Sequence, residues 1–206
     1  MPRTFAPDSV PPDEALARLR DGNRRFVSGD GSAFRRWHPG LIDGQAPFAS
    51  VLGCSDSRAP AEYVFDQGLG DLFVIRVAGN IVAPSLVGSV EFATSQFGTR
   101  LVVVMGHTNC GAVDATIHAL ERGPASGSKN LQSIVDRITP HVQHLLSGPG
   151  DHQAHLAAAV RANALASARE LRRSSPLLQN HVDRGHVVIV AAVYDLATGV
   201  VAFLDS

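Results

Sequence analysis

Short, almost unbroken apolar runs alternate with longer segments of mixed polarity along this chain, and glycine or small polar residues close most of the runs. Such runs are typical of strands buried on both faces of a parallel sheet. Parallel strands are predicted at residues 48–53, 72–77, 101–106 and 187–194, and the short turn before 200–204 predicts an antiparallel edge strand there. The pattern therefore predicts an α/β fold with a mostly parallel central sheet and helices on both faces.

The segments between these runs have the apolar spacing of helices. Helices are predicted at residues 13–27, 61–66, 84–97, 110–122, 131–146, 153–173 and 176–184. Apolar side chains on several sides of the 84–97 helix predict that it is highly buried. The first helix stands outside the strand pattern, so its stripe of Leu16, Leu19 and Phe26 must be buried on its own body or on another subunit.

Chain length and composition favour one domain over residues 1–206, with an N-terminal arm and helix at 1–30 and an α/β core at 45–206. Residues 1–9 are predicted to be an irregular arm, and residues 28–47, which include Trp37, a long loop.

The charge of the chain is nearly balanced, because 18 basic residues oppose 19 acidic residues. Neither a nucleic acid nor a membrane is therefore expected as a partner, and a small molecule is. No stretch approaches the roughly 20 apolar residues of a membrane span, and the first residues lack the apolar segment of a secretory signal. A cytoplasmic protein is expected, in which the two cysteines stay as thiols.

Three side chains with metal-binding chemistry follow two of the predicted strands. Cys54 comes directly after the first strand, and His107 and Cys110 follow the third. If these strands are neighbours in a parallel sheet, the three side chains converge at its carboxyl edge. Two thiolates and one imidazole suit a tetrahedral Zn²⁺ ion, one per chain, with the fourth position open for catalysis. A helix beginning at Cys110 would favour its thiolate. The alternative is two buried free cysteines.

Asp56 and Arg58 alternate with Cys54 along the same loop. The Arg58 guanidinium can hold the Asp56 carboxylate by paired hydrogen bonds. Held in this way, the carboxylate can accept a hydrogen bond from a hydroxide on the metal; released, it could bind the metal and displace the water. The pair could therefore be an on/off gate, and the alternative is a structural ion pair.

The motifs Cys-Ser-Asp-Ser-Arg at 54–58 and His-Thr-Asn-Cys-Gly at 107–111 resemble those of the β-class carbonic anhydrases. The similarity covers about 45–113, with a matching strand and turn near Tyr194. It implies reversible hydration of carbon dioxide to bicarbonate and a proton by zinc hydroxide attack, with the same three ligands and the same aspartate–arginine dyad. It also implies a homodimer or a dimer of dimers, in which the N-terminal helix lies on a neighbouring subunit and would cover the apolar stripe.

The resemblance assigns substrate contacts as well. Gln45, nine residues before Cys54, matches a glutamine whose amide reaches a neighbour's active site and hydrogen-bonds the substrate. Gly111 most simply serves a tight turn, although its backbone could also contact substrate. Some family members bind bicarbonate at a regulatory site of Trp, Arg and Tyr. Here Arg76 and Tyr194 fit but Val51 replaces the Trp, so weak or no bicarbonate inhibition through this site is expected.

Several alternatives remain at this stage. The same nucleophile could hydrolyse carbonyl sulfide or carbon disulfide, or Asp56 could fill the fourth metal position permanently in a non-catalytic zinc- or bicarbonate-binding protein. A small apolar substrate pocket is expected to be lined by Phe65, Val82 and Val87. The pairs His141/His144 and His152/His155 could bind metal, but no acidic or sulfur-bearing residue joins them, so a solvated face is expected, with proton transfer to buffer as the alternative.

Overall fold

Residues 9–31, 39–123 and 127–204 are described in the computed structural model, and within them five strands form one sheet in the order β2-β1-β3-β4-β5. The strands are β1 (Ala49–Gly53), β2 (Leu72–Arg76), β3 (Leu101–His107), β4 (Val188–Tyr194) and β5 (Val201–Leu204). Strands β1 to β4 are parallel to one another, and β5 is antiparallel to β4. The predicted fold class is confirmed, including the antiparallel edge.

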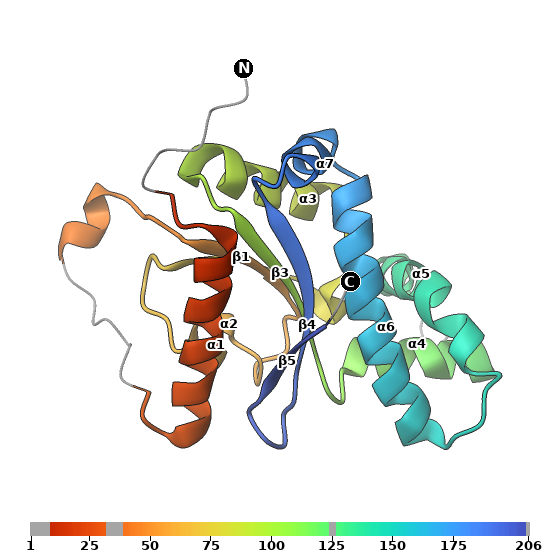
Figure 1. The fold of residues 1–206 in the computed structure, drawn as a ribbon. Helices are drawn as coiled ribbons and strands as arrows, with labels where there is room; N and C mark the ends of the chain where they lie inside the picture. The colour runs from red at the N-terminus through yellow and green to blue at the C-terminus, as the bar shows by residue number, and fades with distance from the viewer. Residues whose placement is uncertain (1–8, 32–38, 124–126, 205–206) are drawn as a thin grey trace.

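Helices cover both faces of this sheet (Figure 1). The α-helices are α1 (Pro12–Ser28), α2 (Ala61–Val64), α3 (Pro84–Phe92), α4 (Gly111–Arg122), α5 (Lys129–Val142), α6 (His152–Arg173) and α7 (Pro176–Asp183). Helices α1 and α2 contribute to the core on one face, and α3, α6 and α7 to the core on the other. Helices α4, α5 and α6 pack together near the carboxyl end of β3. None of the described helices has both the length and the apolar character needed to cross a bilayer.

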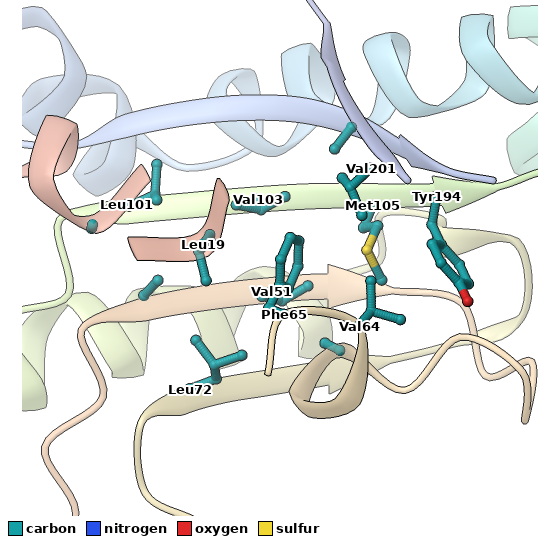
Figure 2. Packing of buried hydrophobic residues seen from close by; sticks show 14 of the residues in the cluster. Leu19, Val51, Val64, Phe65, Leu72, Leu101, Val103, Met105, Tyr194 and Val201 are labelled. Carbon is teal, nitrogen blue, oxygen red and sulfur yellow. The ribbon is translucent and has the colours of Figure 1, made fainter. Parts of the chain in front are cut away.

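The central strand β3 shows why the apolar runs are unbroken. All of its residues are buried, and successive side chains alternate between the two cores. Val103 and Met105 point toward the α1 side (Figure 2), whereas Val102 and Val104 pack on the α3 and α6 side. A strand covered on both faces needs apolar residues at every position.

Helix α1 buries its apolar stripe on its own chain. Leu19 is fully buried in the same core as β1 and β3 (Figure 2), and Leu16 and Phe26 pack against that core. Asn23 fixes the helix further: its Nδ2 donates to the carbonyl oxygens of Val64 and Gly199, at 3.0 and 2.9 Å. The helix's own chain therefore buries Leu19 completely and covers Leu16 and Phe26 in part.

The segment predicted as one buried helix at 84–97 differs from the prediction. Helix α3 ends at Phe92 and continues as a π-helical turn, Ala93–Phe97. Val87 and Val90 are buried as expected, but Phe92 is 51% exposed, so the predicted high burial is wrong for this side chain. The reason is its position beside Phe73 of the edge strand β2, where no further strand covers it.

Within the loop predicted at 28–47, residues Pro39–Asp43 form a 3₁₀ helix. Trp37 and the greater part of the 1–9 arm lie outside the described residues.

We predict that Leu19→Ala lowers the free energy of unfolding by about 2–5 kcal/mol, because it removes a fully buried side chain from the sheet's core. Chemical denaturation of the wild-type and variant proteins measures this difference. Leu16→Ala, at a partly buried position of the same helix, is the matched control and should cost less. Equal and small effects of both substitutions would contradict the packing of α1 described above.

Candidate metal centre

The side chains of Cys54, His107 and Cys110 meet at the carboxyl edge of the sheet. Strand β1 delivers Cys54, His107 is the last residue of β3, and Cys110 is the N-cap of α4. Strands β1 and β3 are parallel neighbours. After β1 the chain crosses to β2 on one side of this pair, whereas β4 lies on the other side, next to β3. An α/β sheet forms a crevice between two such strands, at their carboxyl ends. The ligand-type atoms of the three residues all lie within 4.8 Å of one another.

The geometry of these atoms fits a tetrahedral zinc ion. Cys54 and Cys110 are free cysteines whose sulfur atoms are 3.9 Å apart. A tetrahedral ion with Zn–S bonds of about 2.3 Å would place two sulfurs about 3.8 Å apart. Buried His107 Nε2 has no hydrogen-bond partner in the described part of the chain. Its Nδ1 is 2.9 Å from the Thr108 carbonyl oxygen, so we assign the proton to Nδ1 and leave the Nε2 lone pair for a metal.

The two sulfurs compete for one negative charge when no cation lies between them. The hydrogen bond between the two sulfurs and the Gly79 N–H, which is 3.3 Å from the Cys54 sulfur, lower the pKa of Cys54. The neighbouring thiolate raises the pKa of Cys110, although the first N–H groups of α4 act in the opposite direction. The thiolate preference of Cys110 at the start of α4 stays a prediction for the metal-bound site. A divalent ion would remove the conflict, because coordinated thiols are deprotonated.

Burial lowers the pKa of His107, but the nearby Cys54 sulfur and the Thr108 carbonyl outweigh burial and raise the pKa overall. The imidazole is thus held between an anionic sulfur and a backbone acceptor, which restricts its orientation.

Gly79 is a supporting residue whose donor role the sequence reasoning missed. It follows β2 at the same sheet edge and has φ +72°, a left-handed conformation that favours glycine. A Cβ atom there would lie 2.8 Å from Ile138 Cδ1 and 3.1 Å from Ala112 Cβ. Asn163 Nδ2 holds the Gly79 carbonyl oxygen at 2.8 Å. The Ala-Gly-Asn turn after the second apolar run was the available signal.

Asp56 and Arg58 form the predicted pair beside the three ligand-type side chains. Arg58 Nε and Nη2 donate to the two carboxylate oxygens of Asp56, at 2.9 and 2.7 Å. This guanidinium holds the pKa of Asp56 well below its usual range. Asp56 Oδ2 is also 3.8 Å from His107 Nε2. The carboxylate therefore rests on Arg58 while lying at the edge of the metal centre.

Arg76 stabilises the backbone of this loop. Its Nε donates to the Cys54 carbonyl oxygen at 3.0 Å and its Nη2 to the Asp56 carbonyl oxygen at 2.6 Å. Val51 and Tyr194 are buried in the α1-side core (Figure 2). Because two carbonyl groups already use the Arg76 guanidinium, weak bicarbonate inhibition through this position stays our prediction.

The structure does not bring Gln45 to the centre within one chain. Gln45 is exposed and precedes β1, whereas Cys54 follows it. A five-residue strand spans about 16 Å, and β1 lies between the two residues, so they flank opposite ends of this strand. Gly111 is the exposed first residue of α4, and a Cβ atom there would meet nothing within 4 Å.

The predicted apolar pocket of Phe65, Val82 and Val87 is wrong. Phe65 is buried in the core on the α1 side of the sheet, and the two valines belong to the core on the α3 and α6 side. The side chains of α2 and α3 lie on opposite faces because the two connections cross the sheet on different sides.

Comparison with known proteins identifies the family. The family model described as carbonic anhydrase matches residues 49–201. Carbonic anhydrase 2 of Mycobacterium tuberculosis is 35% identical over 196 residues, covering 91% of this chain and 90% of that protein. The carbonic anhydrase of Pseudomonas aeruginosa is 33% identical over 194 residues, which are 90% of this chain and 86% of that protein.

Solved structures agree with this assignment. The β-carbonic anhydrase CcaA superposes with a TM-score of 0.70 at 26% identity, over 92% of this chain and 95% of that one. The β-carbonic anhydrase CafA of Aspergillus fumigatus superposes with a TM-score of 0.70 at 25% identity, over 94% of this chain and 90% of that one. The chain therefore belongs to the β-class carbonic anhydrase family and is a carbonate dehydratase.

Proposed function

We propose that Cys54, His107 and Cys110 hold one Zn²⁺ ion per chain and that carbon dioxide is reversibly hydrated there to bicarbonate and a proton. The observation that carries this proposal is the buried, unpartnered Nε2 of His107, which lies within 4.8 Å of two free sulfurs. Zinc bound by this set would lower the pKa of a water molecule and supply hydroxide as the nucleophile.

Asp56 is proposed to orient the nucleophile. Its carboxylate is kept ionised by Arg58, so it can accept a hydrogen bond from an O–H group but cannot donate one. The two Arg58 hydrogen bonds fix the direction of its lone pairs, and Oδ2 lies 3.8 Å from His107 Nε2. Positioning of this kind contributes to catalysis because the acceptor is already aligned before the reaction begins.

The same pair is proposed to act as a gate. A carboxylate released from Arg58 would lie next to the metal ligands and could take the position of the water. Arg58 is largely exposed, with 57% of its side chain accessible, so its hold on Asp56 is open to solvent and to anions.

Gln45 is proposed to act from a neighbouring chain, because the length of β1 separates it from the centre of its own chain. The active unit would then be a homo-oligomer, either a dimer or a dimer of dimers. The backbone of Gly111, at the start of α4, is proposed to contact the substrate.

We also infer that the enzyme works in the cytoplasm, as one domain over residues 1–206. Two buried free cysteines suit a reducing compartment. Burial of Leu19 in the core of the sheet supports folding of the N-terminal helix with the rest of the chain.

Stopped-flow hydration of carbon dioxide tests the metal requirement. We expect activity in the zinc-loaded protein, loss after zinc is removed with a chelator, and recovery when zinc is returned. Full activity without zinc would contradict the proposed centre. A zinc-loaded protein that binds bicarbonate without turnover would indicate a non-catalytic role, and activity on carbonyl sulfide or carbon disulfide alone would indicate a hydrolase.

The pH dependence of kcat should rise from about pH 6 to about pH 9. Two thiolate ligands donate more charge to zinc than imidazoles do, so the pKa of the water should be higher than at a three-histidine site. Activity then increases as pH rises through that pKa. Asp56 stays ionised over this whole range because Arg58 lowers its pKa, so it adds no second inflection to the pH profile of activity. A flat profile would contradict this prediction.

Arg58→Ala should give a protein that retains zinc but loses activity by about 100-fold or more, because Asp56 is no longer held in position. Metal analysis and stopped-flow assays on the same preparation measure both quantities. Arg24→Ala, which removes an exposed arginine paired with Asp21, is the control and should leave both unchanged. Full activity in Arg58→Ala would refute the positioning role.

A further inference from the structure

A second group of metal-ligating side chains lies between α4 and α6, which pack against each other (Figure 1). Asp114 and His118 come from α4, and His152 is the first residue of α6. Asp114 Oδ1 is 2.7 Å from His152 Nε2 and 3.6 Å from His118 Nδ1. One ligand-type atom from each residue lies within 4.8 Å of the other two. None of the three has a role in the activity described above.

This arrangement corrects the sequence expectation for the histidine pairs. His152 does not act with His155, whose Nε2 is 3.1 Å from the Gly148 carbonyl oxygen. Instead an acidic residue does join His152, and it comes from another helix. Asp114 was missed because it lies 38 positions earlier in the chain.

We propose that Asp114, His118 and His152 form a binding site for a second divalent transition-metal ion, with Zn²⁺ as the ion that best suits it. Two imidazoles and one carboxylate are a common ligand set for such ions and leave further positions for water. Asp114 and His118 are four residues apart, so they share one face of α4.

The positions of the two rings support this proposal over a simple hydrogen bond. A structural link between α4 and α6 needs only the Asp114–His152 pair and assigns no role to His118. His118 instead stacks on His152, with ring centroids 4.9 Å apart and an angle of 29° between the planes. The stacking restricts both rings while a nitrogen of each faces the same carboxylate oxygen.

The backbone that carries these ligands is well fixed. The Asp151 carboxylate caps α6 by accepting the Ala154 N–H at 2.9 Å, which orders the turn from which His152 projects. Helix α4 is anchored by Val113 and Ile117, which are almost completely buried. The side chains of the three ligands are 36–40% exposed, so an ion can reach them from solvent without opening the core.

The proposed ion would link the helix that begins beside Cys110 to the long helix α6. It would replace the Asp114–His152 hydrogen bond, and it would bind only to the folded protein. Excess Zn²⁺ should therefore raise the thermal unfolding temperature of enzyme whose first centre is already filled.

The test uses zinc-loaded enzyme without an affinity tag, dialysed against micromolar Zn²⁺, with zinc per chain measured by elemental analysis. We expect two zinc ions per chain in the wild type and one in His118→Ala and in Asp114→Asn. His144→Ala, at an exposed histidine outside the cluster, is the matched control and should keep two. Excess Zn²⁺ should raise the unfolding temperature of the wild type and of the control, but not that of His118→Ala.

A wild type that retains one zinc ion per chain would overturn the proposal. Retention of two ions by both His118→Ala and Asp114→Asn would also overturn it, because the second ion would then lie elsewhere. His118 is 3.6 Å from Asp114, beyond hydrogen-bond distance, so its loss should lower the unfolding temperature without added zinc only slightly, through the lost stacking on His152. His118→Gln serves as a second variant of similar length and should likewise retain one ion.

Discussion

The parallel pairing of β1 with β3 is the constraint on which the metal centre depends. In this register Gly53 lies opposite Met105, so Cys54 leaves its strand beside the end of β3, where His107 stands. A shift of two residues would move Cys54 about 7 Å along β3, beyond the distance that one metal ion can bridge. A shift of one residue would turn the buried side chains of β1 to the wrong faces. Packing of the two cores and placement of the ligands therefore require the same register.

Most of the groups that support the centre are backbone amides and carbonyls. The Gly79 N–H contacts the Cys54 sulfur, the Thr108 carbonyl orients His107, and Arg76 holds the carbonyl groups of the Cys54–Asp56 loop. Such contacts come from three different loops at one sheet edge. The consequence is a set of ligands arranged before any metal binds, with a conflict of charge between two sulfurs that a cation resolves.

Helix α4 connects this centre to the second group of ligands. Its N-cap is Cys110, and Asp114 and His118, about one and two turns further along, lie beside His152 of α6. The N-terminus of this helix points at the metal centre, and residues four apart share one of its faces, so one helix carries ligand-type side chains of both groups. A cation at the outer group would act on a helix whose first turn adjoins a zinc ligand.

The sequence by itself determined the fold class, the positions of the strands and the placement of Cys54, His107 and Cys110 just after two of them, because apolar runs and the residues that close them are local features. The pairing of those two strands, which brings the three side chains together, came from the tertiary structure. The sequence also determined the Asp56–Arg58 pair, whose members are two positions apart. Only the tertiary structure decided that Leu19 is buried on its own chain and that Asp114 joins His152. Each of these depends on the face or edge where an element lies, which is set by packing between residues far apart in the chain.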